Sequence, residues 1–204
     1  MGGAAAVSST NYNVVDKYDF VSSANATDVG ELTVARRLPT GSSGIDYGYT
    51  IGGLAGSATY TNVIDRFAFA SDANAVDVGN LTVNRYGGAG GNGNGYGYSM
   101  GGGISGNVVN VIDKWQYVST ANATDVGDLT LARATYNGSG SSPDHGYVAG
   151  GSGGGAQNII ERTAFASDNK VAILCWVANS VEADNSMQNP ININNGFTIA
   201  FHIS

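Results

Sequence analysis

The chain repeats itself with a period of 48 or 49 residues. The segment Asn13–Phe20 returns as Asn62–Phe69, as Asn110–Tyr117 and, in weaker form, as Asn158–Phe165. Its acidic residue stands at positions 16, 65, 113 and 161, in steps of 49, 48 and 48 residues. A unit of this length is one supersecondary structure that cannot bury both of its faces alone. We therefore expect the units to stack against one another.

The pattern within each unit is that of short β-strands. The odd-numbered residues from Val63 to Phe69 alternate with Ile64, Arg66 and Ala68, which gives a run with two distinguishable faces. Glycine-rich stretches separate such runs, and no window of ten or more residues carries a helical period. The 31 glycines are about twice the ordinary share, which suits many tight turns. The sequence therefore predicts an all-β protein of four-stranded antiparallel units.

Each unit resembles a kelch repeat. A hydrophobic run leads into a glycine pair (Gly52-Gly53), an aromatic strand follows (Ile64–Phe67), and a second short strand ends at an arginine, as at Arg85. The tryptophan that follows the aromatic strand in kelch repeats is replaced by valine, as at Val78. The resemblance implies a kelch-like β-propeller with about three to four blades in this chain. The expected parts are residues 1–35 (a partial blade), 36–84, 85–132 and 133–169.

Residues 170–204 leave the repeat and form an expected β-hairpin-like tail. Val171–Val177 and Gly196–Ile203 are its strand candidates, and a polar stretch, Asn179–Asn195, joins them. Such a tail would either close the first blade or pack against another copy. We favour assembly into a homo-oligomer, because an open stack leaves unpaired sheet faces.

Function is suggested by a closer resemblance. Repeats of the type seen at Ile64–Phe67, followed by Asp77-Val-Gly79 and Leu-Thr, are similar to those in structural and tail-associated proteins of marine bacteriophages. This resemblance implies a virion protein of a fibre or tail, with other virion subunits or further copies of itself as partners. The alternative is an intracellular, cytoplasmic kelch-type scaffold for protein–protein interaction.

Composition and motifs argue against other classes. The net charge is −7 and no cluster of Lys and Arg exists, so nucleic-acid binding is not expected. No apolar run reaches the length of a membrane helix, and the start has no basic segment of a signal peptide. Catalysis and cofactors are not expected either, because His145 and His202 stand in unrelated contexts and Cys175 is alone.

The repeated polar residues have a structural and a functional interpretation. Asp-x-Gly recurs in the first three units and is expected to form a turn in which the aspartate bonds local backbone and the glycine takes a positive φ. Calcium binding by these aspartates is the alternative, and no metal site is predicted. Three arginines are expected to pair with acids of neighbouring blades, such as Asp16, with anion binding as the alternative. The turn residues are Asp28, Gly30, Asp77, Gly79, Asp125 and Gly127; the arginines are Arg36, Arg85 and Arg133.

Binding is expected where the repeats differ. Residues 38–47, 86–96 and 134–145 share a position but not a sequence, and loops on a rigid scaffold commonly carry binding residues. Tyrosine faces and polar side chains there suit a surface glycan, whereas free drift of glycine-rich tips is the competing interpretation. The candidate ligand-binding residues are Tyr47, Tyr86, Asn92, Asn94, Tyr96, Tyr136, Asn137, Asp144 and His145.

Overall fold

The computed structural model describes residues 10–136, 138–166 and 171–176. All regular elements in these residues are strands, β1 to β14, and they form four antiparallel sheets. No helix capable of crossing a membrane occurs in this part of the chain. The expectation of an all-β fold is therefore confirmed.

Strand order follows the sequence within every sheet. The first sheet pairs β1 (Tyr12–Lys17) with β2 (Thr27–Arg36). The second contains β3 (Thr40–Ser43), β4 (Tyr47–Leu54), β5 (Tyr60–Ala68) and β6 (Val76–Asn80). The third contains β7 (Ala89–Gly93), β8 (Tyr96–Ile104), β9 (Asn107–Gln116) and β10 (Thr124–Asp128). The fourth contains β11 (Ser139–Ser141), β12 (His145–Ala149), β13 (Ile159–Ala164) and β14 (Val171–Trp176).

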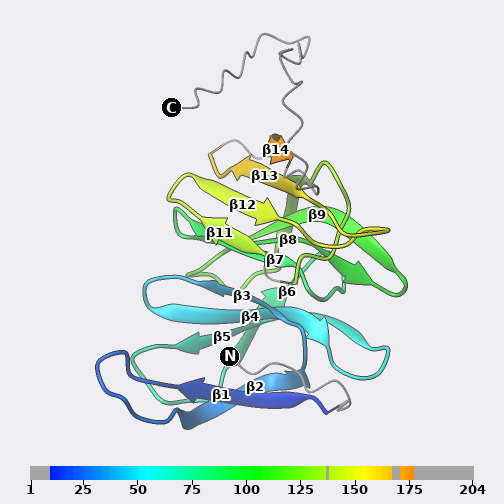
Figure 1. The fold of residues 1–204 in the computed structure, drawn as a ribbon. Coiled ribbons are helices and arrows are strands. Elements are labelled where there is room, and N and C mark those ends of the chain that lie inside the picture. Colours follow the sequence, from blue (N-terminus) through cyan, green and yellow to red (C-terminus); the bar gives the residue numbers. More distant parts are fainter. Residues whose placement is uncertain (1–9, 137, 167–170, 177–204) are drawn as a thin grey trace, which may run out of the picture.

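The sheets are stacked in chain order, with β1–β2 at one end and β11–β14 at the other (Figure 1). The short first strands lie next to one another, because β3 contacts β7 and β7 contacts β11. The large apolar side chains fill the space between sheets. Ile64 and Leu81 of the second sheet, for example, share a buried cluster with Trp115 and Tyr117 of the third.

The end of the repeat differs from the expectation. Val171–Trp176 was expected to belong to a separate tail, yet it is the fourth strand of the fourth sheet. Ile160 pairs with Cys175 just as Ile112 pairs with Gly127, so the register of the repeat continues. The Asp-x-Gly motif is lost in this strand, and the pattern therefore did not reveal it. The expected second tail strand, Gly196–Ile203, lies outside the described residues.

Candidate functional site

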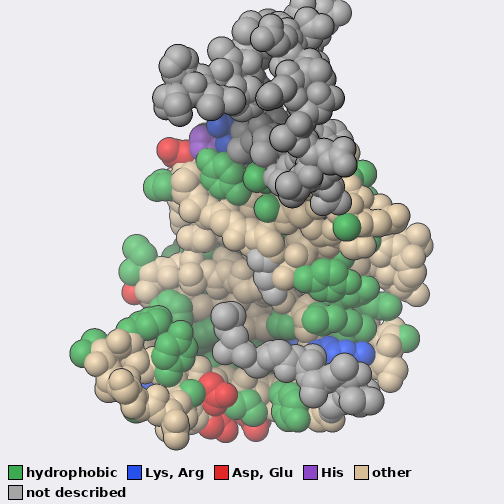
Figure 2. Space-filling view, in the orientation of Figure 1, with side chains coloured by type: hydrophobic (Ala, Val, Ile, Leu, Met, Phe, Trp, Pro, Cys, Tyr) green, Lys and Arg blue, Asp and Glu red, His purple; other side chains and the backbone are tan. Residues whose placement is uncertain are grey.

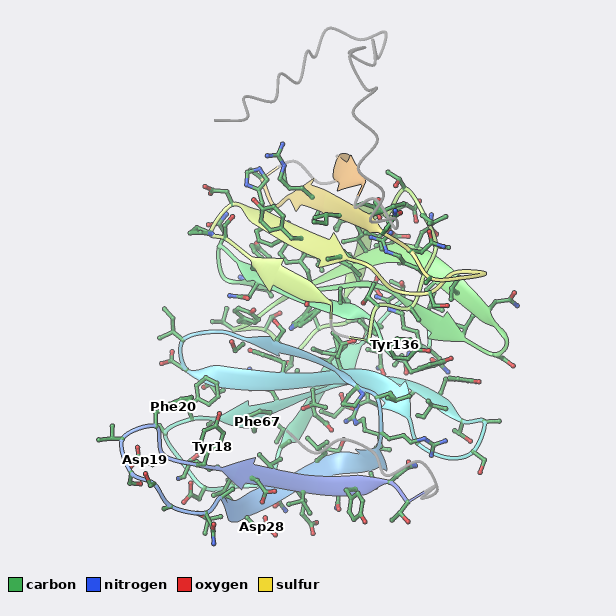
Figure 3. All side chains as sticks on the ribbon, in the orientation of Figure 1. Tyr18, Asp19, Phe20, Asp28, Phe67 and Tyr136 are labelled. Carbon is green, nitrogen blue, oxygen red and sulfur yellow. The ribbon has the colours of Figure 1, made fainter. Side chains whose placement is uncertain are left out.

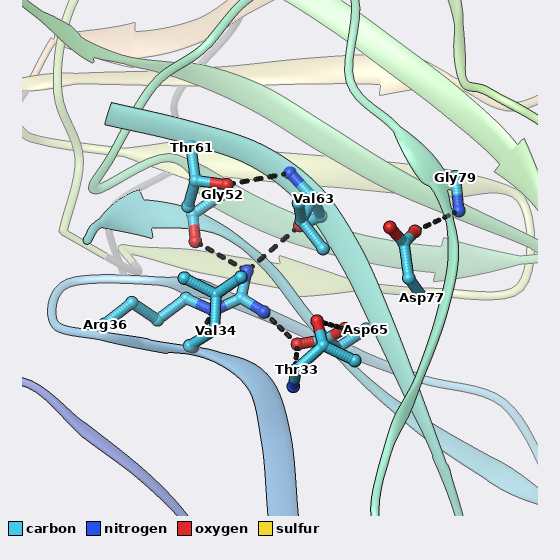
Figure 4. A network of polar contacts seen from close by, with 9 residues as sticks. All are labelled: Thr33, Val34, Arg36, Gly52, Thr61, Val63, Asp65, Asp77 and Gly79. Carbon is cyan, nitrogen blue, oxygen red and sulfur yellow. Dashed lines mark hydrogen bonds and ion pairs between the residues drawn. The ribbon is translucent and has the colours of Figure 1, made fainter. Parts of the chain in front are cut away.

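A buried ion pair joins each sheet to the next. Arg36, at the end of the first sheet, contacts Asp65 of β5, and both side chains are fully buried (Figure 4). The Thr33 backbone N–H and hydroxyl donate to the two oxygens of the same carboxylate, at 3.1 and 2.6 Å. Arg36 also donates to the carbonyls of Gly52 and Val63, each at 3.1 Å. We call this arrangement the inter-sheet lock.

The lock recurs at the two other junctions. Thr82 and Arg85 hold Asp113, with an Arg85–Asp113 distance of 3.0 Å. The equivalent acid in the fourth sheet is Glu161, which Thr130 and Arg133 contact. Burial lowers the pKa of Arg85, and the adjacent Asp113 acts in the opposite direction. Each of the three guanidinium groups is thus paired with a buried carboxylate. This pairing argues against the alternative interpretation, in which the arginines bind an anion.

Asp16 departs from the expected pairing. It occupies the position of Asp65 in its repeat, but it is exposed and has no basic partner among the described residues. The physical reason is its place in the stack, because the partner arginine of every lock comes from the preceding sheet. No sheet precedes β1–β2 in the described part of the chain.

The Asp-x-Gly turns bond their own backbone. The carboxylates of Asp28, Asp77 and Asp125 accept from the N–H two residues later, at 3.1, 2.9 and 3.0 Å. The φ angles of Gly30, Gly79 and Gly127 are +158°, +148° and +148°. Glycine is needed at Gly79 for a second reason, because a Cβ there would lie 2.4 Å from the Ala121 carbonyl oxygen of the next repeat. These turns therefore serve sheet docking, and one oxygen of each aspartate is already used.

The candidate binding residues divide into two groups. Six lie at or beside the turns between first and second strands: Tyr47, Asn92, Asn94, Tyr96, Asp144 and His145. Two, Tyr86 and Tyr136, lie beyond the opposite end of the first strands, in the connections between sheets. Asn137 lies outside the described residues. The nine residues therefore do not form one site.

The two tyrosine rings of the first group each lie beside a basic side chain from a neighbouring strand. The Arg66 guanidinium lies 4.7 Å from the Tyr47 ring centroid, and the Lys114 ammonium lies 4.4 Å from that of Tyr96. Such cation–π contacts occupy a ring face that a ligand would otherwise use. This group is the weaker candidate for binding.

The second group belongs to an aromatic strip that crosses three repeats. Tyr86 stacks on Tyr60 with a centroid separation of 5.6 Å, and Tyr136 lies 6.3 Å from Tyr86 on a tilted ring. Tyr60, which sequence reasoning missed, begins β5 and has no aromatic counterpart in the other units. We call these three residues the tyrosine strip. Tyr136 is 51% exposed. Figure 3 labels its position, and Figure 2, in the same orientation, shows hydrophobic side chains gathered there.

Glycines let the strip lie flat on the backbone. A Cβ at Gly103 would lie 2.5 Å from the Tyr86 ring, and one at Gly87 would lie 3.0 Å from the Tyr136 ring. The Tyr136 N–H donates to the Gly87 carbonyl at 2.9 Å, which holds this residue at a φ of +49°. A positive φ at a large aromatic residue is strained, so the surrounding structure fixes its orientation.

The environment of Tyr86 favours its neutral hydroxyl. Burial raises the pKa of Tyr86, and the neighbouring Tyr136 and Tyr60 add to the effect. The strip thus offers apolar ring faces together with hydroxyls that donate and accept hydrogen bonds. Neither comparison with family profiles nor comparison with curated proteins finds a match for this chain.

Proposed function

We propose that the chain is a non-enzymatic structural and adhesion module of a virion, built from kelch-like propeller blades, that binds a host glycan through the tyrosine strip. The observation that carries the binding proposal is the strip itself. Tyr60, Tyr86 and Tyr136 come from successive repeats and lie side by side at the surface.

The propeller part of the proposal draws support from the arrangement of the sheets. Three consecutive sheets have the same strand order, and their shortest strands lie together at one side of the stack. Backbone hydrogen bonds link the connections there, from Gly87 N–H to the Leu38 carbonyl and from Thr135 N–H to the Gly87 carbonyl, both at 2.9 Å. Blades arranged about an axis place their first strands in this way.

The virion part of the proposal rests on the resemblance of the repeats to phage structural proteins. The locks are consistent with a mechanical role, since each buries a charge pair between neighbouring sheets. Removing one partner of such a buried pair is strongly destabilising, so neighbouring sheets depend on each other for stability. Mass spectrometry of purified particles should recover peptides of the chain. Recovery only from the soluble fraction of infected cells would favour the scaffold alternative.

The glycan part of the proposal follows from ring chemistry. A sugar ring presents a face of C–H groups that packs on an aromatic face, while its hydroxyls bond to polar neighbours. Tyr136 offers the most exposed ring of the strip, with the Tyr86 ring beside it. The strip has no charged member, so neutral sugars suit it.

A glycan array with purified protein tests this proposal. We expect binding of at least one host surface glycan, and a loss of about tenfold in affinity for Tyr136→Ala, equivalent to about 1.4 kcal/mol. Tyr12→Ala is the matched control, because Tyr12 is 66% exposed but lies on β1. Circular dichroism would establish that both variants keep their strands. Equal binding by the Tyr136→Ala variant would exclude the strip as the binding site.

A further inference from the structure

Among the described residues, the β1 edge of the first sheet has no neighbouring strand. β1 holds the position that β5 and β9 hold in their sheets, but β5 is flanked by β4 and β6, whereas β1 pairs with β2 alone in the described residues. The strand that would lie at the other edge of β1 corresponds to β4 and β8. Unpaired backbone groups along such an edge are a template for an added strand.

The packing shows which side chain the first sheet lacks. Tyr49 of β4 stacks on Tyr117 of the next sheet at 4.8 Å, and Tyr98 of β8 stacks on Phe165 at 4.3 Å. Tyr117 and Phe165 are consequently 9% and 4% exposed. Phe69 is the equivalent residue of the second sheet and remains 50% exposed. A strand added to β1 would therefore have to carry an aromatic residue at the position of Tyr49.

The sequence contains a segment with the pattern of such a strand. The second strands of the sheets read Gly48-Tyr-Thr-Ile51, Gly97-Tyr-Ser-Met100 and Gly146-Tyr-Val-Ala149, and Gly196-Phe-Thr-Ile199 has the same pattern. Its spacing also continues the repeat. Gly30 to Gly48, Gly79 to Gly97 and Gly127 to Gly146 are steps of 18, 18 and 19 residues, and Cys175 to Gly196 is a step of 21.

The glycine of this pattern has a steric reason. Gly48 pairs with Phe67, and a Cβ at Gly48 would lie 2.3 Å from the Phe67 ring. Gly97 and Trp115 repeat this relation at 2.2 Å. Tyr18 holds the corresponding position after β1, so the strand beside it needs glycine there.

The same register sets the remaining pairs of the added strand. By analogy with β4 and β5, Gly196 would pair with Tyr18, Phe197 with Lys17, Thr198 with Asp16 and Ile199 with Val15.

The donor of this strand is identified by the direction of the chain. From each sheet the chain passes to the next sheet of the stack, and β14 lies at the opposite end of the stack from β1 (Figure 1). A half-unit that followed β14 by the usual step would extend the stack beyond the fourth sheet, away from β1 of the same chain. We propose that Gly196–Ile199 of one copy pairs with the free edge of β1 in a second copy, head to tail. Phe197 then covers Phe69 of that copy.

Cysteine pairing between two differently substituted copies tests this directly. In a Cys175→Ser background, Val15→Cys protein is mixed with Ile199→Cys protein and oxidised. Side chains directly opposite on paired strands lie close enough for a disulfide. We expect a cross-linked species of twice the 20.8 kDa chain mass. Replacing Ile199→Cys by Thr198→Cys shifts the thiol to the other face and should reduce the yield severalfold.

Two results would overturn the proposal. One is a cross-link that forms only within single chains carrying both Val15→Cys and Ile199→Cys, which would show that the segment pairs with its own β1. The other is no cross-link in either experiment. Peptide mapping of the cross-linked product identifies which cysteines are joined.

Light scattering provides a second measurement that does not depend on cysteines. Gly196→Val should give a particle of 20.8 kDa, because its side chain would collide with Tyr18. Gly140→Val is the control and should keep the mass of the wild-type assembly, since nothing lies within 4 Å of a Cβ at that position. A wild-type chain that is monomeric at all concentrations, or an unchanged assembly in Gly196→Val, would contradict head-to-tail pairing.

Discussion

The first and third sheets carry the same repeated residues in opposite environments. Asp113 is fully buried in its lock, whereas Asp16 is exposed. The aromatic residue two positions later is 4% exposed at Trp115 and 59% exposed at Tyr18. The sequence of each strand is nearly the same, so the difference comes from the neighbour. An interior strand has a sheet on both sides, whereas β1, in the part of the chain that the structure describes, has one only on the side of the second sheet.

This comparison shows that a repeated residue has no fixed role. Asp65 and Asp113 hold sheets together, while the equivalent Asp16 in the first described sheet is exposed to solvent. Repeat proteins behave in this way because each unit depends on its nearest neighbours. Mutations at equivalent positions should therefore differ in their effect according to place in the stack.

The largest difference is expected between Asp113→Ala and Asp16→Ala. Removing Asp113 leaves Arg85 buried without its counter-charge and should reduce the free energy of unfolding by about 3–5 kcal/mol. Asp16→Ala should change it by no more than about 0.5 kcal/mol, because the side chain is exposed. Urea unfolding of both variants measures the two values. Similar losses in both would mean that position in the stack is unimportant.

Alkaline unfolding should report on the interior contact between the second and third sheets. Burial raises the pKa of Tyr49 to about 12 from its ordinary value of 10. The pKa of Tyr49 is higher in the folded than in the unfolded protein. The neutral Tyr49 hydroxyl therefore contributes fully to the free energy of unfolding below pH 10, and this contribution is lost as the pH rises through 12. The loss should reach about 2 kcal/mol. The alkaline loss of stability should be smaller by this amount in Tyr49→Phe, because Tyr117 and Tyr86 also have raised pKa values and still titrate. The two proteins are compared from pH 9 to about pH 12.

A smaller effect is expected at the docking turn. Gly79→Val places a β-branched residue at a φ of +148° and against the Ala121 carbonyl, and should cost about 1–3 kcal/mol. Gly140→Val provides the comparison, because its position is open. An unchanged melting midpoint for Gly79→Val would contradict the turn geometry.

The smallest difference concerns the asparagine before each turn. Asn122 accepts from the Asn80 N–H of the preceding sheet at 3.0 Å. Asn122→Ala should therefore cost about 0.5–1.5 kcal/mol. Asn25 has the same place in the first unit, where the loop is exposed, and Asn25→Ala should be neutral within measurement. Thermal melts of the pair would show whether this bond contributes.

Much of the fold could be predicted from the repeat. Its period and alternating pattern indicated four-stranded antiparallel units. The Asp-x-Gly spacing indicated a turn, and the hydrogen bond from the Gly79 N–H to the Asp77 carboxylate confirms it. Prediction failed where local sequence diverged. β14 has lost the turn motif, and its strand identity depends on pairing with β13.

The site was harder to predict because it combines residues from three repeats. Tyr60 and Tyr136 are 76 positions apart in the sequence, and no repeated pattern relates them. Their proximity depends on how far each sheet is displaced from the previous one. Loop variation pointed to Tyr86 and Tyr136, but it also pointed to six residues at the opposite end of the first strands.

A double-mutant cycle at one lock tests the central claim, that paired charges join neighbouring sheets. The free energy of unfolding is measured for the wild type, Arg85→Met, Asp113→Ala and the double variant. If the two side chains depend on each other, the double variant should lose at least about 2 kcal/mol less than the sum of the single variants. Additivity to within about 0.5 kcal/mol would contradict the lock.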